Sequence, residues 1–89
     1  MDTVFRRNPS IEASAMKAES LLFDPVTNKF CLLNETAAFV WERLEQPVTA
    51  DQLATAVCER FSGVERSQAD KDVRGLLHRL NELAFIAAE

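Results

Sequence analysis

The spacing of hydrophobic and polar positions along this chain changes its period once, close to Leu33. Before that residue, apolar and polar residues alternate in 11–15, and two short apolar runs occupy 19–24 and 29–33. Pro25 and Asn28 lie between the two runs and favour a turn, because proline presets φ and asparagine tolerates a left-handed backbone. The pattern therefore predicts three antiparallel strands, the last two joined as a hairpin.

Beyond this point the apolar residues recur with the 3.6-residue period of a helix. A first helix is expected to begin after Asn34, a suitable N-cap residue, and to end near Glu45. A second helix is expected to begin after Thr49, because Thr49 and Gln52 have the spacing of a capping box. Gly63 follows the last apolar residue of that stripe and marks its end.

The third and longest helix is expected to open at Ser67 and to reach Ala84. Its apolar stripe consists of Val73, Leu76, Leu77, Leu80, Leu83 and Ala84. Helices and hairpins of this size are not stable alone, so all must share one core, with Trp41 at its middle. We predict an α+β, winged-helix-like fold in which a small three-stranded antiparallel N-terminal sheet packs on three α-helices.

Length and composition are those of one small globular domain. The chain has 89 residues, 47% of them hydrophobic, and a net charge of −4. We expect residues 1–10 to be a flexible N-terminal arm and residues 11–89 to form a single domain. No apolar run approaches the roughly 20 residues that span a bilayer, and no signal peptide is visible. We therefore expect a cytoplasmic protein without a membrane partner.

Residues for catalysis, metal binding or phosphate binding are scarce. Cys31 and Cys58 are far apart, and His78, the only histidine, neighbours neither of them. With Gly63 and Gly75 as the only glycines, a glycine-rich phosphate loop cannot form. We expect no catalytic residue, no metal site, no cofactor and no enzymatic activity.

Binding to nucleic acid is the first alternative, because three helices and a hairpin resemble a winged helix. Duplex binding needs lysine and arginine gathered on one face. Here they are interleaved with acidic residues throughout 51–82. A winged-helix DNA-binding regulator stays the competing class, and a general protein-docking module is the third.

Peptide binding is favoured by the strand at 29–33. Apart from Lys29 it is apolar, and an edge strand with so little charge is a template for strand addition. The alternative is that both faces of this strand are covered within the domain. Phe39, on the polar side of its helix, is either a contact surface or packing for the N-terminal arm. Gly75, on the outward side of the last helix, is either a place of close approach for a partner or without function.

The segment from Leu21 through Trp41 resembles the pyrroloquinoline quinone biosynthesis protein D (PqqD) family. The most distinctive part is Leu33-Asn34-Glu35-Thr36-Ala37-Ala38-Phe39-Val40-Trp41 between hairpin and first helix. Val48-Thr49 followed by Leu53-Ala54, and Asp72-Val73 followed by Leu76-Leu77 and Leu80, are similar to the family's second and third helices. The resemblance covers about residues 11–86.

This resemblance implies a non-catalytic chaperone for a ribosomally made precursor peptide, as in pyrroloquinoline quinone biosynthesis and related pathways. The leader segment of the precursor would add as a strand in the cleft beside the third helix, and a modifying enzyme, often a radical S-adenosylmethionine protein, would be the second partner. Carried onto this chain, the peptide-binding residues are Phe30, Cys31, Leu32, Asp72, Val73, Leu76, Arg79 and Leu80. The residues leave open the identity of the precursor and whether the domain is a monomer or a homodimer.

Overall fold

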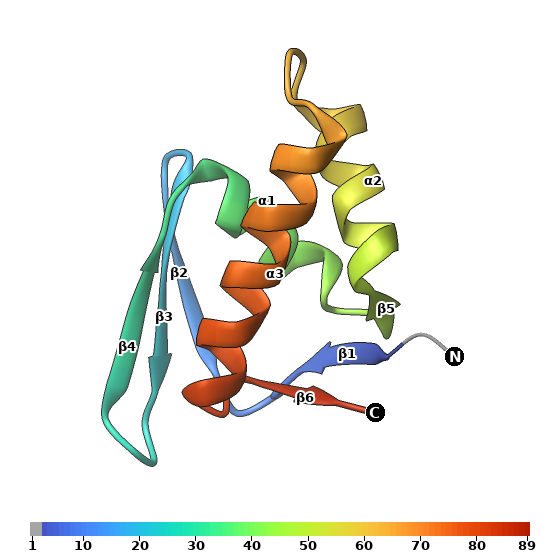
Figure 1. Cartoon of the computed structure of the whole chain (residues 1–89). Helices are drawn as coiled ribbons and strands as arrows, with labels where there is room; N and C mark the ends of the chain where they lie inside the picture. The colour runs from blue at the N-terminus through green and yellow to red at the C-terminus, as the bar shows by residue number, and fades with distance from the viewer. Residues whose placement is uncertain (1–2) are drawn as a thin grey trace.

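The computed structural model describes residues 3–89 and has an α+β architecture (Figure 1). Its strands are β1 (Val4–Arg7), β2 (Glu12–Met16), β3 (Glu19–Asp24), β4 (Lys29–Leu33), β5 (Val48–Thr49) and β6 (Ile86–Ala88). Its helices are α1 (Glu35–Arg43), α2 (Ala50–Arg60) and α3 (Arg66–Glu82). The three helices and the sheet β2-β3-β4 are those expected, so the predicted fold class is confirmed.

The hairpin of β3 and β4 is held by the turn chemistry that the sequence indicates. Asn28 adopts a left-handed φ of 61°, and its N–H donates to the carbonyl oxygen of Asp24 over 2.8 Å. The Asp24 carboxylate also accepts from the N–H of Val26 at 2.9 Å. This turn sets the register that pairs Leu22 with Cys31 and directs both side chains into the core.

Helices α1 and α2 begin at the residues predicted as caps. Asn34 Oδ1 accepts from the N–H of Ala37 at 2.9 Å. Thr49 and Gln52 form a reciprocal capping box, with both bonds near 3 Å. Each cap satisfies backbone N–H groups that have no partner within the helix. Because these bonds join residues only three positions apart, the start of each helix can be predicted from the local sequence.

Helix α3 differs from the prediction at both ends. It begins at Arg66 rather than at Ser67, and no side chain caps it. It ends at Glu82 because Ala84 takes a left-handed φ of 62°. The N–H of Phe85 then donates to the carbonyl oxygen of Leu80 at 2.9 Å, the 6→1 bond of a Schellman motif. This reversal places Phe85 in the core and starts β6.

A second sheet, in the order β5-β1-β6, is absent from the sequence-based prediction. Its central strand β1 pairs with β5 through Val4 and Thr49, and with β6 through Phe5 and Ala88. The expectation of a flexible arm over 1–10 is therefore wrong for residues 4–7. Residues 1 and 2 of that arm lie outside the described residues. Both partners of β1 are distant in sequence, so no local pattern signals the pairing.

The core lies between the helices and the inner face of β3 and β4 (Figure 1), whereas β2 is exposed along its whole length. Trp41 is 3% exposed, which confirms its predicted place in the core. Phe39 is half-buried: it packs against the core and, with Phe61, lines a surface cavity. Its ring meets that of Phe61 edge-on, with centroids 5.7 Å apart, and this pair joins α1 to the end of α2.

Candidate functional site: a groove between strand β4 and helix α3

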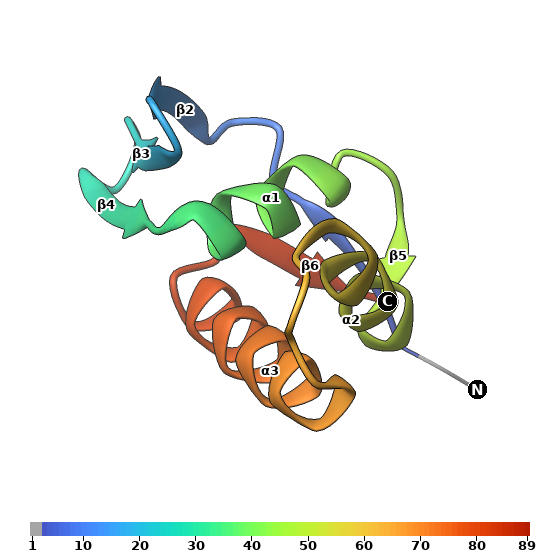
Figure 2. The ribbon, with the colours of Figure 1, turned by 90° about the horizontal axis from the view of Figure 1, so that it is seen from above.

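Strand β4 is an edge strand. In the sheet order β2-β3-β4 it bonds only to β3, so every second residue of β4 turns its N–H and C=O groups away from the sheet. The view from above shows β4, rather than the other edge strand β2, on the side of the sheet nearer to α3 (Figure 2). The open edge of this sheet nearer to α3 is therefore the edge of β4.

A cavity lies between this edge and the C-terminal end of α3. We call it the strand section of the groove; it is lined by Lys29, Phe30, Cys31, Leu32, Arg79, Glu82 and Leu83. Phe30 and Leu32 are 67% and 55% exposed, whereas Cys31 is buried. The alternative that both faces of the strand are covered is thus wrong, because its outer face is open. Exposed apolar side chains beside an unpaired edge are the features that strand addition uses.

A second cavity, of about 510 Å³, continues along α3 toward its N-terminal half. We call it the helix section of the groove; it is lined by Asn34, Thr36, Ala37, Val40, Lys71, Asp72, Val73, Gly75, Leu76 and Arg79. Val40, Val73 and Leu76 are buried and make an apolar floor between α1 and α3. Arg79 lines both sections and joins them into one groove, the β4–α3 groove.

Seven of the eight residues predicted to bind a peptide line this groove. Phe30, Cys31, Leu32 and Arg79 line the strand section, and Asp72, Val73, Leu76 and again Arg79 line the helix section. Leu80 does not belong with them. It is fully buried and lines neither section, because it lies at the centre of the stripe by which α3 packs on the core.

The charges in the groove are mixed: three cationic side chains, Lys29, Lys71 and Arg79, line it together with the carboxylates of Asp72 and Glu82. Asp72 accepts a hydrogen bond from Gln68 at 2.8 Å, and Glu82 pairs with His78. Within residues 3–89, Lys29, Lys71 and Arg79 form no ion pair. An acidic residue of a ligand would therefore find unpaired positive charge here.

Sequence reasoning missed most of the wall that α1 contributes. Thr36 and Ala37 lie on the first turn of α1 and face α3 across the helix section. On the opposite wall, formed by α3, Lys71 and Gly75 also line the cavity and were not among the predicted peptide-binding residues. Among these residues only Gly75 could be singled out from the sequence, because a glycine inside a helix is unfavourable. The packing of α1 beside α3, which forms the cavity, is a tertiary feature that the sequence pattern does not show.

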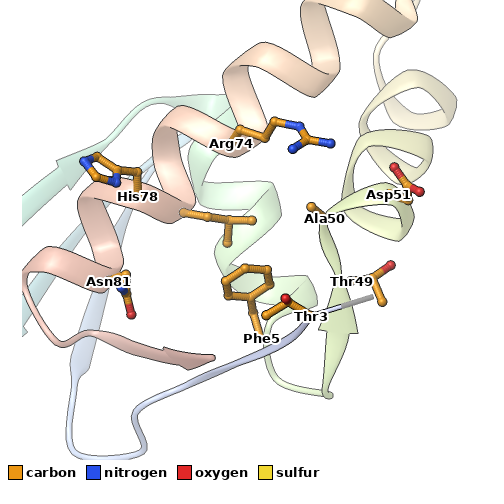
Figure 3. Close-up of a pocket in the computed structure, with 9 residues that line it drawn as sticks. Thr3, Phe5, Thr49, Ala50, Asp51, Arg74, His78 and Asn81 are labelled. Carbon is orange, nitrogen blue, oxygen red and sulfur yellow. The ribbon is translucent and has the colours of Figure 1, made fainter. Parts of the chain in front are cut away.

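Another cavity lies on a different side of α3 and is built differently (Figure 3). Arg74 extends from α3 toward α2 there, Phe5 of β1 lies below it, and His78 points away from both. Strand β1 lines this cavity and is the central strand of the sheet β5-β1-β6. Because β1 is paired on both sides, it cannot accept a further strand. It is therefore a poorer place for an extended peptide than the β4–α3 groove.

The described residues, 3–89, hold no group of three or more histidine, cysteine or acidic residues placed to bind a metal ion. None of the helices in that range combines the length and apolar character that crossing a membrane requires.

The sequence profile described as Coenzyme PQQ synthesis protein D (PqqD) matches residues 19–86, most of the chain and both walls of the groove. The chain belongs to the PqqD family. A comparison with curated proteins gives no significant match for this PqqD-family chain.

Two solved structures share the fold of this PqqD-family protein. One is TbiB1 in complex with the TbiA(beta) leader peptide, with a TM-score of 0.79 and 20% identity over 91% of this chain and 93% of that one. The other is a lasso peptide synthetase B1 complexed with the leader peptide, with a TM-score of 0.77 and 26% identity over 93% of this chain and 96% of that one.

Proposed function

We propose that this PqqD-family protein is a non-catalytic chaperone for a ribosomally synthesised precursor peptide. It binds the leader segment by strand addition to β4 and presents the peptide to a modifying enzyme, with a radical S-adenosylmethionine protein as the expected type. A chaperone that meets a newly made precursor works in the cytoplasm, where we expect this protein to act.

The observation that carries the proposal is the position of an unpaired strand edge beside an apolar-floored groove. Main-chain groups of β4 supply affinity for any extended segment, and the groove supplies contacts for alternate side chains. The groove follows α3 from Lys71 to Leu83. Twelve helical steps of 1.5 Å give about 18 Å, the length of about five or six extended residues.

The two solved relatives support the same reading. Both are described as complexes with a leader peptide, and both cover nearly the whole of this chain. The residues of the groove themselves suit binding better than reaction. They include no histidine or serine, and Cys31, the one thiol among them, is buried.

An NMR titration tests the proposal. The ¹⁵N-labelled protein is titrated with synthetic N-terminal segments of small open reading frames next to its gene, and with a random DNA duplex as control. We expect shifts on both walls of the groove, and slower hydrogen exchange at alternate amides of β4, since only every second N–H faces the open edge. Protection at β2 or β6, or shifts with the duplex alone, would contradict the proposal.

A further inference from the structure

Gly75 stands where a helix does not need a glycine. It lies in the middle of α3, where glycine is the least favourable residue after proline. Its backbone is not in the left-handed region, and a Cβ built on it would meet no atom within 4 Å. Neither the backbone nor internal packing therefore requires a glycine at this position.

The space that Gly75 leaves open belongs to the helix section of the groove. Below it lies the apolar floor of Val40 and Leu76, and on its rim are Lys71 and Arg79. A helical side chain lies over the turn that precedes its own Cα, so a larger residue at position 75 would cover the groove toward Lys71. The missing side chain thus keeps the floor accessible from outside.

We infer that Gly75 determines side-chain specificity in this groove by leaving room for a large apolar residue of the bound peptide. This inference rests on the proposed function, because the occupant is an extended segment continuing from the β4 edge. Arg79 lines both sections, so a peptide paired with β4 reaches the helix section without leaving the groove. A Leu-, Ile- or Phe-sized side chain matches the floor, and the unpaired cations on the rim suit an acidic neighbour.

The variants Gly75→Ala and Gly75→Leu test this inference without endangering the fold. Both replace glycine by a good helix former in open space, so both proteins are expected to be at least as stable as the wild type in urea. Asn81→Leu is the matched control, because it adds the same side chain on α3 at a position that lines the cavity of Figure 3 instead of the groove.

The probe is a displayed library of random 12-residue peptides, selected in parallel on the wild type, Gly75→Leu and Asn81→Leu. We expect the wild type and Asn81→Leu to enrich a large apolar residue at one position, and Gly75→Leu to enrich Gly, Ala or Ser there. Truncating that residue to Ala should weaken binding to the wild type by about tenfold or more, and leave binding to Gly75→Leu unchanged.

The outcomes separate this inference from the proposed function. If Gly75→Leu selects the same large residue and binds it as tightly as the wild type does, the role of Gly75 is refuted while peptide binding stands. If the wild type enriches no peptide motif and the leader segments of the NMR experiment also fail to bind, the proposed function itself is refuted.

Discussion

Leu32 of β4 and Arg79 of α3 line the same cavity from opposite walls, although they are 47 positions apart in the sequence. One wall offers an exposed apolar side chain next to an open strand edge, and the other offers a guanidinium that forms no ion pair within residues 3–89. A peptide between them would meet main-chain, apolar and ionic contacts at once. Substitutions at Leu32 and at Arg79 separate the apolar contribution from the ionic one.

Replacing Leu32 by alanine should weaken leader-peptide binding by about three- to tenfold. The side chain is 55% exposed, so its remaining surface is free to be buried by a ligand at about 25 cal/mol per Å². Val26→Ala is the matched control, because Val26 is apolar, 82% exposed and lies outside the groove in the β3–β4 turn. Fluorescence anisotropy with a labelled peptide measures both. Equal affinities of the two variants would argue against contact at β4.

Reversing the charge of Arg79 should weaken binding of acidic peptides by about three- to tenfold at low salt. Exposed ion pairs contribute at most about 1 kcal/mol and are screened by salt, so the difference from the wild type should shrink in 1 M NaCl. Arg74→Glu makes the same change on the same helix, but at a residue that lines the cavity of Figure 3. Equal losses for Arg79→Glu and Arg74→Glu would indicate an effect of net charge alone.

Ala84→Gly should stabilise the protein by about 1 kcal/mol. Ala84 has a φ of 62°, a conformation that costs an L-residue with a Cβ roughly 1–2 kcal/mol and costs glycine little. Ala87→Gly in β6 is the control and should destabilise the fold, since glycine weakens a strand. Urea denaturation followed by tryptophan fluorescence measures both. A less stable Ala84→Gly variant would show that the C-terminal turn of α3 does not hold this conformation.

Removing residues 1–7 should destabilise the fold by about 3 kcal/mol or more. Without β1, strands β5 and β6 lose the strand that pairs with both of them, and the core loses Phe5, an apolar side chain whose burial is worth up to about 1.5–3 kcal/mol. Arg6→Ser retains the strand and removes only the ion pair with Glu89, in which both side chains are about half exposed, so it should change little. A truncated protein as stable as the wild type would restore the interpretation of this segment as a flexible arm.

The elements that the sequence determined by itself are those held by bonds between near neighbours. Asn34 caps α1 through a residue three positions ahead, Thr49 and Gln52 cap α2 over the same distance, and Asn28 closes the hairpin turn onto Asp24. Such bonds form wherever the right residue types occur at the right spacing. The helices and the hairpin could therefore be predicted before any packing was known.

Tertiary structure alone decided which edges and faces stay open. Strand β1 exists because two distant segments, more than 40 and about 80 positions away, pair with it on either side. Periodicity placed Leu80 in the apolar stripe of α3, but only the packing of α3 shows that Leu80 is fully buried in the core. Its neighbour Arg79 lines the groove instead. A local pattern shows that one face of an element is apolar. Whether that face is covered within the domain or stays open to a peptide depends on how segments distant in sequence pack against it.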